Sequence, residues 1–70
     1  MTSTFIIEIA SVPDREEPVA EVWYGHEQVA ELRREGAELR LQIFSTPSSA
    51  AWDFSIDAFL SAIYEAMARL

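Results

Sequence analysis

The chain has 70 residues, half of them hydrophobic, and 12 acidic side chains against five arginines give it a net charge of −7. A chain of this length folds as one domain around a small core, so we treat residues 1–70 as a single domain, and the absence of cysteine excludes disulfides and thiolate metal sites. The acidic charge argues against direct binding to nucleic acid or to an anionic membrane. No basic region precedes the first apolar run and no stretch approaches 18 apolar residues, so a soluble, cytoplasmic protein is expected.

The first half of the chain predicts β-strands. Thr4–Val12 is rich in β-branched residues with partial alternation, and the charged segment 13–18, which begins and ends with proline, stops it. Val19–Tyr24 is the second expected strand. A three-residue loop, Gly25–Glu27, keeps the apolar faces aligned, because it sets Tyr24, Val22 and Ala20 opposite Gln28, Ala30 and Leu32.

Gln28–Arg34 and Ala37–Phe44 are expected to form a second hairpin. A helix over Glu27–Arg40 is the alternative, because much of this stretch has high helix propensity. A two-residue turn at Glu35-Gly36 favours the hairpin, since one register sorts apolar pairs to one face and opposite charges to the other. The predicted pairs are Leu32 with Leu39, Ala30 with Leu41, Arg33 with Glu38, and Glu31 with Arg40.

The carboxyl-terminal stretch has a helical period. Ser55 is a good N-cap for a helix over Ile56–Arg69, and Asp57 and Arg69 suit the two ends of its dipole. The apolar stripe predicted to face the sheet is Ile56, Phe59, Leu60, Ile63, Met67 and Leu70. Trp52 is expected to fill the seam between sheet and helix together with Phe54 and Tyr64. The predicted fold class is α+β: a four-stranded antiparallel meander sheet with one C-terminal helix packed on one face, ββββα.

The sequence offers little for catalysis or cofactor binding. His26 is the only imidazole, and it falls in a predicted turn rather than in a metal or nucleophile motif. The glycines form no phosphate-binding loop. We therefore expect no enzyme activity, no cofactor and no metal site.

The sheet face left uncovered by the single helix is the candidate for function. Trp23 would stand there among carboxylates, and an exposed tryptophan within a polar ring is typical of a protein-binding hot spot. The alternatives are that Trp23 closes a homodimer, or that it is a plain surface aromatic. The predicted partner-binding residues are Ile6, Glu8, Glu21, Trp23, Val29, Glu31 and Arg40, with Glu16 and Glu17 adding charge in the first loop.

Two hypotheses follow for function. The first is a small acidic protein-binding module that acts as a stoichiometric inhibitor of a basic protein or nucleoprotein, of the immunity or phage anti-defence (anti-CRISPR) type. The second is a homodimeric structural or accessory protein with no inhibitory role. The two differ in oligomeric state and in the salt dependence of binding.

Overall fold

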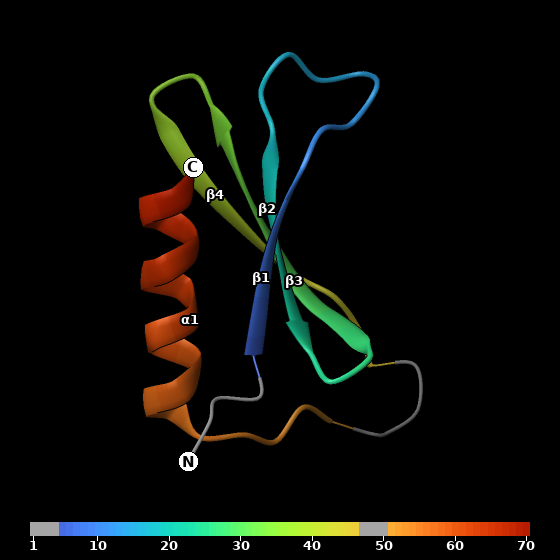
Figure 1. Cartoon of the computed structure of the whole chain (residues 1–70), viewed down its shortest axis with the longest axis vertical. Helices are drawn as coiled ribbons and strands as arrows, with labels where there is room; N and C mark the ends of the chain where they lie inside the picture. Colours follow the sequence, from blue (N-terminus) through green and yellow to red (C-terminus); the bar gives the residue numbers. More distant parts are fainter. Residues whose placement is uncertain (1–4, 47–50) are drawn as a thin grey trace.

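The computed structural model describes residues 5–46 and 51–70 and confirms the predicted ββββα architecture. The elements are β1 (Phe5–Ala10), β2 (Val19–Tyr24), β3 (Glu27–Glu35), β4 (Glu38–Ile43) and α1 (Ile56–Arg69). The strands form one antiparallel sheet in the order β1-β2-β3-β4, and α1 lies along one side of it (Figure 1). The predicted start of the first strand at Thr4, and most of the polar crossover before Trp52, fall outside the described residues.

The first hairpin turn differs from the prediction, and a β-bulge corrects for the difference. Tyr24 pairs with Glu27 across a two-residue turn in which Gly25 has a φ of 64°. That turn alone would set core residues opposite surface residues. A register shift beside Val22 restores the predicted pairs of Val22 with Ala30 and of Ala20 with Leu32, and leaves Val29 as the extra residue. The bulge turns Val29 into the core, where it is fully buried.

The second hairpin turns one residue later than predicted. Glu35 pairs with Glu38 around Gly36-Ala37, because Gly36, with a φ of 63°, takes the first central position of the turn. Every partner therefore moves by two residues. Since side chains alternate with a period of two, each residue keeps its predicted face. The predicted charge pairs are wrong, however: Arg33 lies opposite Arg40, and Glu31 lies opposite Gln42.

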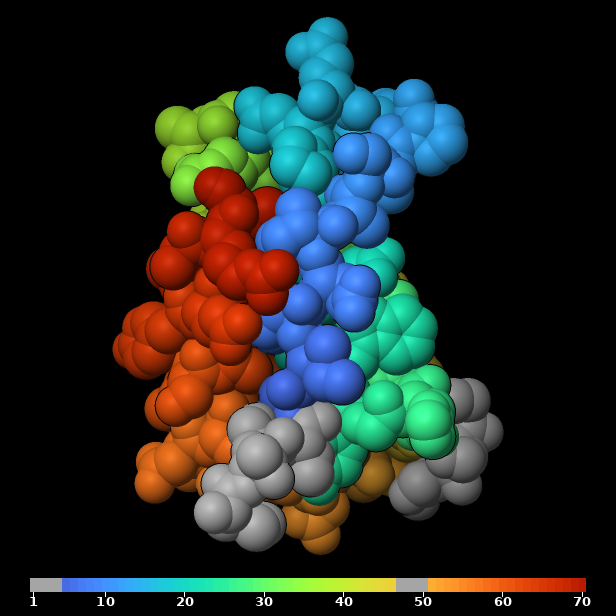
Figure 2. Space-filling model, in the orientation of Figure 1, coloured from blue at the N-terminus to red at the C-terminus, as the bar shows by residue number. Residues whose placement is uncertain are grey.

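The helix has the predicted bounds. The Ser55 hydroxyl accepts a hydrogen bond from the Ala58 amide at 3.2 Å and so caps the first turn. At the other end Arg69 donates to Glu65 Oε2 at 3.2 Å and to the Ile7 carbonyl at 3.0 Å, which ties α1 to the edge strand β1. The carboxyl-terminal part of α1 lies beside β1 in Figure 2, and the two elements are in contact.

The helix is rotated relative to the predicted stripe. Its buried residues are Ala62 and Ala66, whose small side chains let the backbone approach β1 and β2. Phe59, Ile63 and Leu70 pack against the core as expected. The prediction that three further stripe residues face the sheet was wrong, since the exposed fractions are 71% for Ile56, 44% for Leu60 and 41% for Met67.

Aromatic rings close the end of the core at the start of α1. Phe54 is central, with ring centroids 4.9 Å from Phe5, 5.2 Å from Tyr24 and 5.2 Å from Phe59. Trp52 packs beside it, as predicted, and its indole donates to the Phe44 carbonyl at 2.8 Å. Tyr64 does not join this cluster; it is 66% exposed, against the prediction.

Candidate functional site

The sheet face turned away from α1, here called the outer face, carries a row of three carboxylates. Glu8 on β1 lies directly opposite Glu21 on β2, and Glu21 lies directly opposite Glu31 on β3. Cross-strand partners point to the same face, so these side chains form a line across the sheet, here called the acid row. Like charges placed opposite each other destabilise a sheet, so this arrangement opposes folding.

The acid row has no arginine to neutralise it. Within residues 5–46 and 51–70, the ion pairs join Arg15 and Arg33 to Glu35, Arg40 to Glu38, and Arg69 to Glu65. None includes a member of the acid row. Three negative charges are therefore presented on one face without a cationic partner from the described chain.

Trp23 lies next to the acid row and is held in place by it. The indole Nε1 donates a hydrogen bond to Glu21 Oε1 at 3.1 Å, and the side chain is half-buried. Because Ile6 is directly opposite Trp23, an apolar strip runs beside the acid row. Ile6 is 52% exposed. The indole is thus fixed in orientation with part of its surface open to solvent.

Trp23 and two members of the acid row surround a shallow, open depression of about 330 Å³. Its lining residues are Ile6, Glu8, Glu21, Trp23, Gly25 and His26. An aromatic face beside two carboxylates suits a cationic side chain, because both the ring quadrupole and the carboxylates attract positive charge. Its volume of about 330 Å³ would admit one arginine or lysine side chain.

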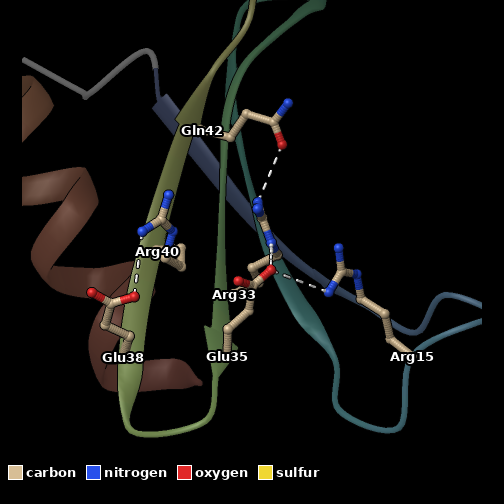
Figure 3. Close-up of polar contacts among 6 residues, drawn as sticks. All are labelled: Arg15, Arg33, Glu35, Glu38, Arg40 and Gln42. Atoms are coloured by element: carbon tan, nitrogen blue, oxygen red, sulfur yellow. Dashed lines mark hydrogen bonds and ion pairs between the residues drawn. The ribbon is translucent and has the colours of Figure 1, made fainter.

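Beyond the acid row, the outer face carries paired charges (Figure 3). Arg33 donates from Nε to Glu35 at 2.8 Å and from Nη1 to Gln42 at 3.1 Å. Arg40 donates to Glu38 at 3.3 Å. The hydrogen bond from Arg33, followed by the charge of the same guanidinium, lowers the pKa of Glu35 below its ordinary value. This end of the face is locally neutralised, so the uncompensated negative charge is concentrated at Glu8, Glu21 and Glu31.

The structure brings together most of the predicted partner-binding residues. Ile6, Glu8, Glu21 and Trp23 line one depression, and Glu31 continues the acid row beside them. Arg40 is on the outer face as predicted, but it lies opposite Arg33 rather than Glu31.

Three predicted residues lie elsewhere. Val29 is not on the outer face: the bulge buries it completely in the core, so it is not available to a partner. Glu16 and Glu17 are exposed in the β1–β2 loop, at the end of the sheet away from the Gly25-His26 turn (Figure 1). They border a second depression of about 280 Å³ together with Arg33 and Arg34. They are therefore separate from the Trp23 site.

Gly25 and His26 were not among the predicted partner-binding residues, although both line the Trp23 depression. The three-residue loop predicted from the sequence did not indicate that these two residues lie beside Trp23. The actual two-residue turn puts His26 at the end of the outer face, close to Trp23 in sequence and in space.

The described residues contain no group of three or more His, Asp or Glu side chains arranged to hold a metal ion. No helix in the described part of the chain is long and apolar enough to cross a bilayer. Comparison with known proteins found no matching family, no similar curated protein and no similar solved structure.

Proposed function

We propose that this chain is a protein-binding module whose outer face engages a basic surface on a protein or nucleoprotein and blocks it stoichiometrically. The acid row attracts and orients the partner, and Trp23 provides the buried contact. A small acidic domain of this kind needs no catalytic group, because occupying the partner's basic surface is sufficient for inhibition.

The observation that supports this most strongly is the alignment of Glu8, Glu21 and Glu31 without a neutralising arginine. The ion pairs that the described residues of the sheet do form lie elsewhere, as between Arg33 and Glu35. A feature that disfavours folding and is left uncompensated is expected where a site serves binding. A cationic partner would supply the missing positive charges.

Trp23 supports the same interpretation. Tryptophan is among the residues that contribute most to protein interfaces, and hot spots are usually surrounded by contacts that exclude water. Here Glu21 fixes the indole by a hydrogen bond, and Ile6 extends the apolar contact on the neighbouring strand. A guanidinium stacked on Trp23 could also pair with Glu8 or Glu21, so attraction and packing act on the same group.

The test is affinity capture with the immobilised chain, identification of the captured protein, and titration of the purified pair by calorimetry. We expect a 1:1 complex whose affinity falls steeply with salt, and loss of the partner's activity in proportion to the chain added. Glu21→Gln combined with Glu31→Gln should weaken binding by tenfold or more, since close charge pairs at interfaces couple by about 1.5 kcal/mol or more. Trp23→Ala should weaken it by a similar or larger factor.

The matched control is Asp53→Asn combined with Asp57→Asn, which changes the net charge equally at exposed positions beside and within the first turn of α1. This control should bind with nearly the parental affinity. Equal weakening by both double variants would mean that only total charge matters, and the acid row would not be the site. A complex that leaves the partner fully active would contradict inhibition while retaining the binding surface.

A further inference from the structure

One flank of α1 exposes large apolar side chains to solvent. Ile56 is 71% exposed, Leu60 44%, Tyr64 66% and Met67 41%. At about 100° per residue these four positions fall within an arc of roughly 80°, so they form a continuous strip, here called the helix strip. The strip lies beside the face of α1 that packs on the sheet through Ala62 and Ala66.

The underside of β4 is also exposed and apolar. Leu41 lies opposite buried Leu32 and Ile43 lies opposite buried Ala30, so both point to the side of the sheet that carries α1. They are nevertheless 46% and 57% exposed. The reason is geometric: four strands span about 14 Å between the outermost two, whereas one helix is about 10 Å wide. Because α1 packs on β1 and β2, it leaves the β4 underside uncovered.

The β4 underside carries no acidic side chain, whereas the helix strip has Asp57 at its edge. Between Val29 and Ile43, the positions that point to the α1 side carry one charged side chain, Arg34, while Glu31, Glu35 and Glu38 point to the outer face. Two chains of charge −7 repel each other through their acidic faces. They can approach through the helix strip and the β4 underside, because these bring apolar groups together and keep both acid rows apart.

We propose that a second copy of the chain covers this surface. In a two-fold symmetric pair, the helix strip of each copy packs on the β4 underside of the other. The same contact therefore forms twice, once in each direction. Each sheet then receives the second helix that its width requires. A standard interface buries about 800 Å² per partner. This is roughly one sixth of the 5021 Å² surface of the chain, and the reciprocal arrangement places both patches of each copy in the interface. The outer faces remain free, and the dimer presents two Trp23 sites.

The experiment is sedimentation velocity, with light scattering, on the full chain at about 1 μM and about 100 μM, a range that brackets a micromolar dissociation constant. We expect a dimer at the higher concentration whose stability is insensitive to salt or increases with it. Tyr64→Arg and Leu41→Arg should each raise the dissociation constant about tenfold or more. Both variants lower the net negative charge, so simple charge repulsion predicts the opposite change.

Matched controls lie beside each substitution. Ser61→Arg adds the same charge on the same helix away from the strip, and Gln42→Arg adds it on the outer side of β4; both should leave dimerisation unchanged. Circular dichroism checks that each variant is folded, and Tyr64→Arg provides the decisive result if Leu41→Arg does not fold. A monomer at about 100 μM overturns the proposal. So does a dimer that Trp23→Ala dissociates and Tyr64→Arg does not, since it would use the outer face. A Tyr64→Arg variant that stays monomeric yet still captures a partner would separate this interface from the outer-face site.

Discussion

Relieving the repulsion within the acid row should make the protein more stable. Replacing Glu8 and Glu31 with glutamine removes both like-charge contacts of Glu21, while Glu21 keeps its own charge and its hydrogen bond to Trp23. The substitutions keep the size and polarity of the side chains. Any gain in the free energy of unfolding therefore reports the electrostatic cost of the row.

The magnitude follows from the register. Each unfavourable cross-strand pair costs about 0.2–1 kcal/mol, so removing two should raise the free energy of unfolding by about 1 kcal/mol at low salt. For a domain of this size, that corresponds to an increase in Tm of about 4–8 °C. Glu21→Gln removes the same two contacts, but it also replaces a charged acceptor of the Trp23 indole by a neutral one. Because charge-assisted hydrogen bonds are about twice as strong as neutral ones, its gain should be smaller by about 0.5–1 kcal/mol.

Thermal and urea unfolding, followed by far-ultraviolet circular dichroism, measures the effect at fixed protein concentration. The comparison is made at about 10 mM and about 1 M salt, where the screening length is about 30 Å and 3 Å. The gain should be largest at low salt and small at high salt. Glu16→Gln combined with Glu17→Gln makes the same change in net charge in an exposed loop, and it should alter stability by no more than about 0.5 kcal/mol.

Two outcomes would refute this reasoning. If the Glu8 and Glu31 double variant is no more stable than the parent at low salt, the carboxylates do not repel each other appreciably. If the Glu16 and Glu17 double variant gains as much, the effect comes from total charge and not from the row.

Three further predictions concern the fold. Phe54→Ala removes the central ring of the aromatic cluster and should lower the free energy of unfolding by about 3 kcal/mol. Tyr64→Ala, at an exposed position, should change it by less than about 0.5 kcal/mol. Urea titrations of monomeric protein measure both. Gly36→Ala should cost about 1 kcal/mol, read from the same titrations, because alanine is strained at a φ of 63° although no atom crowds the position. Arg33 lowers the pKa of Glu35, so the stability contributed by this pair is complete above the ordinary glutamate pKa and disappears as the pH falls through the lowered value. The Tm difference between the parent and Glu35→Gln should therefore be present at neutral pH and vanish at strongly acidic pH. It should also shrink as salt is added.

The two proposed surfaces use opposite sides of one small sheet. The outer face concentrates unpaired acids beside Trp23, and the other side concentrates apolar residues of α1 and β4. If both proposals hold, a dimer would bind two partner sites, or one extended partner twice, and the apparent affinity would then exceed that of a single face. Tyr64→Arg would reveal this as a loss of avidity without loss of 1:1 binding.

The predicted strands and the predicted start of the helix were confirmed, whereas the first predicted turn was one residue too long and the second was placed one residue too early. Period-two alternation and the segment between Pro13 and Pro18 indicated the strands and their faces, and Ser55 marked the start of α1. The acid row and Trp23 could be placed on one face from the sequence because side chains alternate along each strand and the bulge restores the predicted register of Glu21 with Glu31. Local steric and hydrogen-bonding preferences determine these features, and the sequence displays them directly.

The tertiary structure alone decided how these elements meet. Gly36 rather than Glu35 opens the second turn, and the bulge moves Val29 from the outer face into the core; both depend on strand pairing across the sheet. The rotation of α1 depends on Ala62 and Ala66, because apolar residues cover more than half of the helix circumference and periodicity could not select which part contacts the sheet. Close backbone approach selected the small residues, and it left the larger ones on the surface where a second copy can bind.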